Sequence, residues 1–233
     1  SAIMAETFSD YPAYVRLLTL PPAAARVARV RLTGNKRPWH ASCDPPGPAV
    51  GSGGGTSAAL VGAWREHGGK QPFGEWLEAN RVLLVHAGGQ SRRLPAYAPS
   101  GKAAIPIPVR RGSVGQSLDQ DLLSLQEIYL EQLMARAGAS ARLLVACGDM
   151  LLTFAEDRAP LPDADVVILG MPAPAEVASG HGALLVKPDN PTHLVTFLQK
   201  APVERLRQLQ REYHLLLDTG VWLLSGRAVD CLL

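Results

Sequence analysis

Hydrophobic positions along the first part of the chain recur at a helical spacing. Up to residue 40, apolar and basic positions alternate in this way, as in "YVRLLTL" and "AARVARVRL", which predicts a helical N-terminal segment. Residues 44–55, "DPPGPAVGSGGG", are too rich in Pro and Gly for a helix or a central strand and are predicted to form a loop. Thr56 and Ser57 then offer an N-cap for a helix that runs to about His67.

From residue 73 onward the pattern predicts alternating helices and strands. Helices are expected near 73–80, 117–137 and 203–212. Strands are expected at 81–86 and in the apolar runs "ARLLVAC", "DVVILGM", "GALLV", "LVTFL", "HLLL" and "GVWLLS". The runs "ARLLVAC" and "DVVILGM" are continuously apolar, which is typical of strands with both faces covered by helices. We therefore predict an α/β fold with a mostly parallel central sheet over residues 41–233, preceded by a helical preface over residues 1–40.

Composition excludes several classes of protein. No apolar run approaches the roughly 20 residues that span a bilayer, so no membrane association is expected. The net charge of +2 provides no basic stripe for a nucleic acid. Three widely spaced cysteines, Cys43, Cys147 and Cys231, argue against a disulfide framework or a cysteine-based zinc site. They are compatible with a reducing, cytoplasmic location.

The stretch "RVLLVHAGGQSRRLPAYAPSGK", residues 81–102, joins a predicted strand to a glycine turn that carries cations. Glycines allow a sharp bend and a close approach of the backbone to an anion, and Arg and Lys side chains bind phosphate oxygens. The turn is therefore predicted to be a polyphosphate cradle, although a surface turn with solvated cations is the alternative. It matches neither the Walker loop nor the dinucleotide fingerprint. The residues of this cradle are Gly88, Gly89, Gln90, Ser91, Arg93 and Lys102.

Further candidates lie in other loops. Asp149 follows a predicted strand in "LLVACGDM", where a carboxylate can hold Mg²⁺ against phosphates. Gly53 and Gly54, in "GSGGGT", belong to a second glycine turn that can cover a nucleotide, and Lys200 ends a strand in "FLQKAP". An ordinary turn aspartate, a linker and a solvated lysine are the respective alternatives.

The phrases "DPPGPAVGSGGGTSAAL", "HAGGQSRRLPAYAPSGK" and "LDTGVWLLSGRAV" together resemble the fucose-1-phosphate guanylyltransferase family. The similarity covers residues 40–233 and is strongest to the amino-terminal part of bifunctional members that also carry an L-fucokinase. The resemblance implies a Rossmann-like nucleotide-diphospho-sugar transferase fold. It also implies the Mg²⁺-dependent conversion of GTP and L-fucose 1-phosphate into GDP-L-fucose and pyrophosphate.

The resemblance also implies roles for individual residues. Arg93 and Lys102 would hold the triphosphate, Asp149 would hold Mg²⁺, and Lys200 would neutralise the sugar phosphate. On the sugar side, the residues expected near the substrate are His181, Gly182, Asp218 and Gly220. For His181 a purely structural role is the alternative, and Trp222 is expected in the core.

Two other functions stay open on the sequence. One is nucleotidyl transfer to a different sugar 1-phosphate, because a phosphate cradle does not select the base or the sugar. The other is a catalytically idle module that binds a nucleotide or a nucleotide sugar. The resemblance further implies a second metal ligand beyond Leu233, the rest of the transferase domain, a β-helical segment and a C-terminal sugar kinase module.

Overall fold

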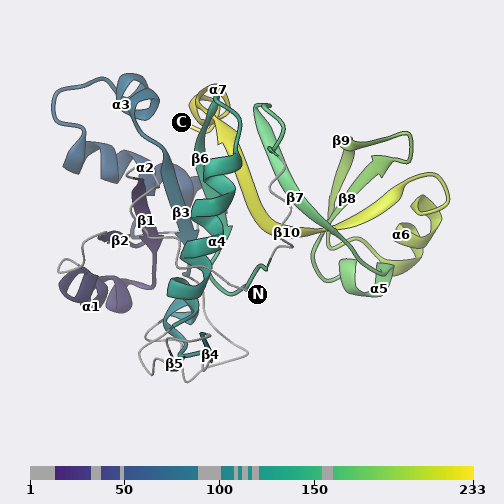
Figure 1. Cartoon of the computed structure of the whole chain (residues 1–233), viewed down its shortest axis with the longest axis horizontal. Coiled ribbons are helices and arrows are strands. Elements are labelled where there is room, and N and C mark those ends of the chain that lie inside the picture. The colour runs from purple at the N-terminus through teal and green to yellow at the C-terminus, as the bar shows by residue number, and fades with distance from the viewer. Residues whose placement is uncertain are drawn as a thin grey trace. The chain divides into compact units, whose positions relative to one another are not determined.

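The computed structural model describes residues 14–32, 38–47, 50–88, 101–107, 110–111, 115–116, 121–153 and 160–233. The chain divides into two compact units, each described here by itself (Figure 1). Unit 1 comprises Ser1–Val167 and Leu223–Leu233, and unit 2 comprises Ile168–Trp222. The strands β7 (Val166–Pro172) and β10 (His214–Ser225) contribute residues to both units.

Unit 1 is built on a parallel sheet with the strand order β2-β1-β3-β6, and β10 lies beside β6. These strands are β1 (Val15–Thr19), β2 (Trp39–Ser42), β3 (Val82–His86) and β6 (Ala141–Cys147). The helices of the unit are α1 (Pro22–Leu32), α2 (Gly51–His67), α3 (Phe73–Ala79), α4 (Leu122–Arg136) and α7 (Gly226–Asp230). Shorter elements are the 3-10 turn η2 (Lys102–Ala104) and the strand pair β4 (Arg110–Arg111) and β5 (Gly115–Gln116).

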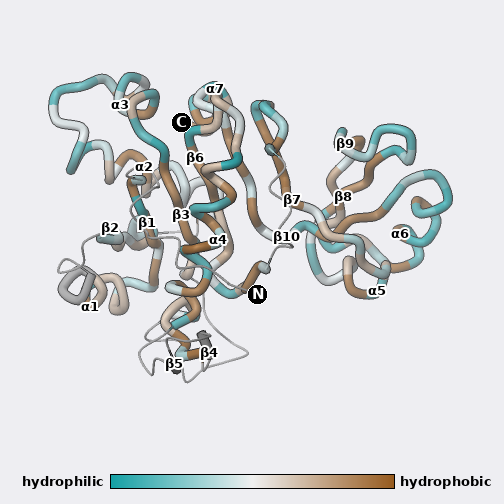
Figure 2. Tube along the Cα trace, in the orientation of Figure 1, coloured by the Kyte–Doolittle hydropathy of each residue, from teal (hydrophilic) through white to brown (hydrophobic). Residues whose placement is uncertain are grey.

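Alternate side chains of β1 enter opposite faces of this sheet. Leu17 packs in a hydrophobic cluster with residues of α2, α3 and α7, including Leu60 and Trp76. The next side chain, Arg16, is 3% exposed and forms ion pairs with Glu127 and Glu131 of α4. Helices therefore cover both faces, which explains why β3 carries the continuous apolar run visible in Figure 2.

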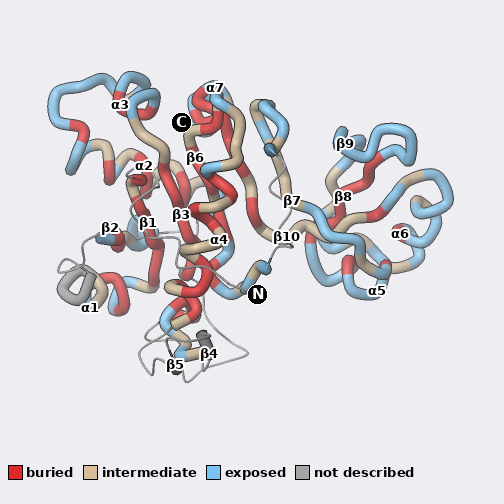
Figure 3. The backbone as a smooth tube through the Cα atoms, viewed as in Figure 1, coloured by how far each residue is buried: buried red, intermediate tan, exposed pale blue. Residues whose placement is uncertain are grey.

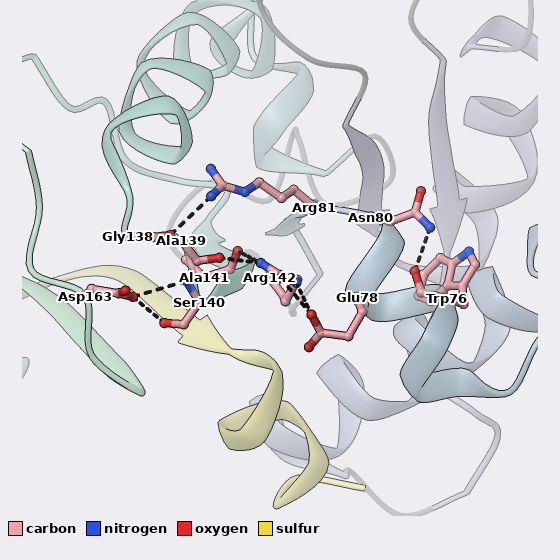
Figure 4. A network of polar contacts seen from close by, with 10 residues as sticks. All are labelled: Trp76, Glu78, Asn80, Arg81, Gly138, Ala139, Ser140, Ala141, Arg142 and Asp163. Atoms are coloured by element: carbon pink, nitrogen blue, oxygen red, sulfur yellow. Dashed lines mark hydrogen bonds and ion pairs between the residues drawn. The ribbon is translucent and has the colours of Figure 1, made fainter.

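Polar side chains form hydrogen bonds at the amino ends of β3 and β6 (Figure 4). The Arg81 guanidinium reaches the turn after α4 and donates to the carbonyl oxygen of Gly138 at 3.1 Å. Arg142, at the start of β6, donates from Nη2 to Glu78 of α3 at 2.7 Å. These contacts lie at the amino ends of β3 and β6. The predicted site residues after these strands lie at the opposite, carboxyl ends.

Unit 2 is an antiparallel sheet in which β8 pairs with both β9 and β10, and β7 pairs with β10. Small helices cover one face through a cluster that includes Ala178, Leu185 and Leu206. The remaining elements of the unit are α5 (Ala175–Ala178), β8 (Gly182–Lys187), β9 (Asn190–Gln199) and α6 (Val203–Leu209).

Several expectations from the sequence are confirmed and others are wrong. The helix expected within residues 1–40 exists as α1, but Val15–Thr19 is a strand that pairs with β2 on one side and with β3 on the other. Residues 51–55 are not loop, because α2 begins at Gly51. The segments "HLLL" and "GVWLLS" form the single strand β10.

The run "DVVILGM" forms β7 as predicted, but helices do not cover both of its faces. Its residues are intermediate or exposed, and Val166 and Met171 are 46% and 50% exposed. Figure 3 shows the contrast between β3, which is buried, and β7, which is intermediate or exposed. The sheet is mixed, whereas a mostly parallel sheet was predicted. Its parallel part belongs to unit 1, and the pairings among β8, β9 and β10 are antiparallel.

Candidate functional site

The strand order of unit 1 marks one position as the natural place for a ligand. From β1 the chain moves outward to β2 and then returns past β1 to β3 on the other side. Loops that leave neighbouring strands in opposite directions open a crevice beyond the carboxyl ends of those strands. In this chain that position lies beyond Thr19 and His86, which are register partners at the ends of β1 and β3.

His86 joins three elements at this position. Its Nδ1 lies 2.9 Å from Oγ1 of Thr19, and its Nε2 lies 2.9 Å from Oγ1 of Thr56 in α2. Burial lowers the pKa of His86 below its usual value, and the nearby carboxylate of Asp44 opposes that shift. The neutral imidazole therefore acts as a bridge between two hydroxyls and fixes α2 against the end of the sheet.

Glycines let the loops after β3 and β6 approach each other. The amide N–H of Gly148 donates to the carbonyl of His86 at 2.8 Å, and a Cβ at Gly148 would lie 2.8 Å from Cα of Ala87. Gly101 has φ +78°, and a Cβ there would lie 2.8 Å from Cδ2 of Leu20. Both positions require glycine, because a side chain would collide with the neighbouring loop.

Lys102 and Asp149, both predicted as site residues, are brought together at this edge. Lys102 opens η2, and its Nζ lies 2.6 Å from Oδ2 of Asp149, two residues after the end of β6. Gln126 of α4, which is 2% exposed, donates from Nε2 to the carbonyl of Cys147 at 3.2 Å and so fixes the end of β6. The pair thus combines a mobile cation with an anchored carboxylate, and each side chain remains partly exposed, at 27% and 51%.

The predicted glycine positions fall in two groups. Gly53 and Gly54 lie in the first turn of α2, whose N-cap, Val50, makes no side-chain capping bond. Free N–H groups of such a turn favour anions. Gly88 follows β3 and is exposed, and nothing described lies within 4 Å of a Cβ built on it. Gly89, Gln90, Ser91 and Arg93 lie outside the described residues.

The predicted residues of unit 2 form a second cluster, at the start of β8, the end of β9 and the middle of β10. The N–H of Lys200 donates to the carbonyl of His181 at 2.8 Å, and a Cβ on Gly182 would lie 2.9 Å from Cβ of Asp218. Lys200 has φ +51°, a left-handed backbone that is uncommon for a residue with a side chain. Its position after the strand and before Pro202 is as predicted.

Asp218 is used within the protein itself. Its Oδ1 accepts the N–H of Gly220 at 2.8 Å and Nε1 of Trp222 at 3.2 Å. Gly220 has φ +75°, which favours glycine, and the ring of Trp222 packs edge-on against Phe197 with centroids 5.8 Å apart. These contacts give Asp218 a structural role. Trp222 was expected in the core, but it is only partly buried and does not belong to the buried core residues.

The contacts of His86 with Thr19 and Thr56 were not predicted from the sequence. Thr19 lies in a segment expected to be helical, and Thr56 was expected to cap a helix that in fact begins five residues earlier. His86 stands directly before the glycine turn, and this signal was available: a polar residue that ends a buried strand needs a partner.

A divalent cation such as Mg²⁺ fits Asp149 in part. The carboxylate offers a hard oxygen ligand at the loop edge, and in the described contacts Lys102 approaches Oδ2, so Oδ1 is left for a metal. Mg²⁺ is commonly held by one or two carboxylates together with phosphates and water. Asp149 therefore suits a metal that arrives with a phosphate ligand better than a metal bound by protein alone.

The chain is similar to a known protein family and to several known proteins. A family model described as "Fucose pyrophosphorylase domain" matches residues 74–233. The chain is 40% identical over 218 residues to "L-fucokinase/L-fucose-1-P guanylyltransferase" of Bacteroides fragilis, covering 94% of this chain and 23% of that protein. It is 28% identical over 214 residues to "Bifunctional fucokinase/GDP-fucose pyrophosphorylase" of Arabidopsis thaliana, covering 79% of this chain and 20% of that protein.

A shorter relative is also named as a fucose-1-phosphate guanylyltransferase. The chain is 25% identical over 205 residues to "Fucose-1-phosphate guanylyltransferase" of Mus musculus, covering 83% of this chain and 32% of that protein. The chain thus spans a fifth to a third of the lengths of these relatives. In its described part, no helix is long and apolar enough to cross a membrane.

Proposed function

Since the chain belongs to the fucose pyrophosphorylase family, we propose that it forms the nucleotide-binding part of an enzyme that makes GDP-L-fucose and pyrophosphate from GTP and L-fucose 1-phosphate. The observation that carries the proposal is the pairing of Lys102 with Asp149, where the loop after β6 contacts the end of β3. A cation, a metal-binding carboxylate and an open backbone are the groups that a triphosphate requires. We also propose the Rossmann-like nucleotide-diphospho-sugar transferase fold, which the strand order β2-β1-β3-β6 supports.

The reaction needs little acid or base chemistry. An oxygen of the sugar phosphate attacks the α-phosphorus of GTP, a new P–O bond forms, and the bond from the α-phosphorus to the bridging oxygen breaks, releasing pyrophosphate. Two anions must meet in line while charge grows on the leaving group, so correctly placed positive charge is the main requirement. When bound, Mg²⁺ at Asp149 would neutralise part of that charge.

Each residue of this chain then has a simple task. Lys102 holds phosphate oxygens, and Arg93 is proposed to do the same from the glycine turn. The backbone around Gly88 and the first turn of α2, with Gly53 and Gly54, line the nucleotide. Lys200 of unit 2 neutralises the sugar phosphate, and His181, Gly182 and Gly220 border the sugar.

The full-length protein is proposed to contain a sugar kinase module that supplies L-fucose 1-phosphate, in keeping with the two activities that the names of the bacterial and plant relatives join. We also propose a cytoplasmic location, in keeping with Cys43, Cys147 and Cys231, which are exposed and not joined by disulfides.

Two measurements test the proposal. Calorimetric titration of this chain with GTP, ATP, UTP and CTP in Mg²⁺ should give the tightest binding for GTP. Pyrophosphate release from GTP and L-fucose 1-phosphate should be found in the full-length protein, with α-D-mannose 1-phosphate as the control sugar. A preference for another sugar or base would point to a different nucleotidyltransferase. Binding of a nucleotide sugar without turnover in the full-length protein would point to an idle module, for which retention of Asp149 has no evident use.

A further inference from the structure

Three side chains with metal-binding groups meet on unit 1, away from the nucleotide site. His40 lies on β2, and Glu66 and His67 are the last two residues of α2. Thr56, which contacts His86, lies eleven residues before His67 on the same helix, so the two places are about 16 Å apart along its axis. The three residues therefore lie apart from those proposed to hold phosphates.

The geometry of this cluster suits a single ion. Nε2 of His67 lies 2.9 Å from Nδ1 of His40, and Oε2 of Glu66 lies 3.8 Å from Nε2 of His67. One ligand atom from each residue lies within 4.8 Å of the other two. In a tetrahedral zinc site with Zn–N bonds of about 2.0–2.1 Å, two nitrogens lie about 3.3 Å apart. A small rotation of either imidazole, both of which are partly exposed, reaches that spacing.

We propose that His40, Glu66 and His67 form a binding site for a transition-metal ion of the Zn²⁺ type, separate from the nucleotide site. Two imidazoles and one carboxylate are the ligand set that such ions prefer, whereas Mg²⁺ prefers oxygen ligands alone. Three protein ligands leave one position of a tetrahedral ion for water. The proposal does not depend on the reaction assigned to the protein.

The ion would join two elements that the chain connects only through a loop. β2 stands at the end of the strand order, and in the described part of the chain its strand partner is β1. A metal bound by His40 and His67 would tie this strand to the carboxyl end of α2. The rings already lie against each other, with centroids 4.1 Å apart, so little ordering is needed when the ion binds.

The alternative is a hydrogen bond in which one neutral imidazole donates to the other. Such a bond needs only the two histidines and gives Glu66 no essential part, whereas a metal site uses all three ligands. Replacement of Glu66 by Gln therefore separates the two possibilities, because it keeps both imidazoles and removes only a carboxylate oxygen.

The test is titration of the tag-free chain with Zn²⁺ and, for spectroscopy, with Co²⁺. His40→Gln, Glu66→Gln and His67→Gln are each expected to weaken Zn²⁺ binding at least about tenfold. His193→Gln, at an exposed histidine on β9, is the matched control and should bind like the parent. Zn²⁺ should also raise the melting temperature of the parent and of the control, but not that of the three variants.

Other outcomes would overturn the proposal. Undetectable Zn²⁺ binding by the parent would do so, as would equal binding by the parent and Glu66→Gln. A thiolate-to-cobalt charge-transfer band that disappears in Cys43→Ser would place the ion on a cysteine instead. The expected Co²⁺ spectrum contains ligand-field bands of a tetrahedral nitrogen and oxygen site without that charge-transfer band.

Discussion

The ammonium of Lys102 and the carboxylate of Asp149 partner each other across 47 positions of the chain, with 2.6 Å between Nζ and Oδ2. A triphosphate bound at the glycine turn would compete with Asp149 for the lysine, and a metal would compete with the lysine for the aspartate. Both side chains are partly exposed, so the pair itself is worth only about 0–1 kcal/mol. We therefore expect nucleotide and metal together to replace the ion pair.

Lys102→Ala is expected to weaken GTP binding about tenfold or more, because it removes a charge-assisted contact worth roughly 1.5–3 kcal/mol. Calorimetric titration measures the loss. Lys70→Ala is the matched control, since Lys70 is an exposed lysine in the turn after α2. Equal affinities for the two variants would remove Lys102 from the triphosphate site.

Asp149→Asn is expected to have opposite effects with and without the metal. Without Mg²⁺ the variant should bind GTP up to about fivefold more tightly than the parent, because Lys102 no longer has a competing carboxylate. With Mg²⁺, turnover by the full-length protein should be lost while the isosteric substitution keeps the fold. Mg²⁺-dependent pyrophosphate release at the parental rate would contradict the assignment.

Two glycine substitutions are expected to separate folding from binding. Gly148→Ala should destabilise unit 1 by about 1–3 kcal/mol, because the new Cβ meets the backbone of Ala87. Gly88→Ala should leave the stability unchanged and weaken GTP binding, since no described residue lies within 4 Å of a Cβ there and a bound nucleotide would meet it. Gly62→Ala, within α2 and without close neighbours, should stabilise the protein by about 0.5–1 kcal/mol. Denaturant unfolding and GTP titration of all three variants check these expectations.

The lowered pKa of His86 predicts how stability depends on pH. The unfolded chain binds a proton at this residue at a higher pH than the folded chain does, so the contribution of His86 is complete above the unfolded pKa of about 6.5. It is lost as the pH falls from that value through the folded pKa. His86→Gln should lower stability by about 1 kcal/mol at neutral pH and show a smaller decline toward pH 5 than the parent. Thermal unfolding at several pH values, with His193→Gln as control, measures the difference. Parallel pH curves for the parent and His86→Gln would show that this residue does not contribute.

Lys200→Gly is expected to raise stability and lower activity. The left-handed backbone at φ +51° costs a residue with a side chain about 1 kcal/mol, and glycine adopts it without that cost. The same change removes the charge proposed to neutralise the sugar phosphate, so the KM for L-fucose 1-phosphate should rise in the full-length protein. A loss of stability with an unchanged KM would contradict both assignments.

Much of the fold of this protein follows from local sequence patterns. β3 and β6 are buried apolar runs, and Ser225 caps α7 by accepting the N–H of Ala228 at 3.1 Å. β1 was mistaken for helix because it alternates a buried cation with apolar residues. Arg16 is buried only because two glutamates on α4, more than a hundred residues later, pair with it. No local pattern reports that pairing.

The candidate site, like the fold, could be predicted only in part from the sequence. Lys102 and Asp149 could be predicted because each follows a loop signal, and the structure brings them together. The links of His86 to Thr19 and Thr56 could not, since they depend on strand order and on the unexpected start of α2 at Gly51. A run of glycines has low intrinsic helix propensity, and here the packing of α2 against the sheet overrides it.

The pairing of β1 with both β2 and β3 has a consequence for anyone who expresses part of this protein. The family match begins at residue 74, after β1, β2 and α2. A chain trimmed to that boundary would lose the partner of β3 on one side and expose the edge of a strand whose residues Val82–Val85 are 0% exposed. An uncovered, apolar strand edge is a template for pairing with other chains. The matched region alone is therefore an aggregation hazard, and the shortest usable fragment must begin before Tyr14.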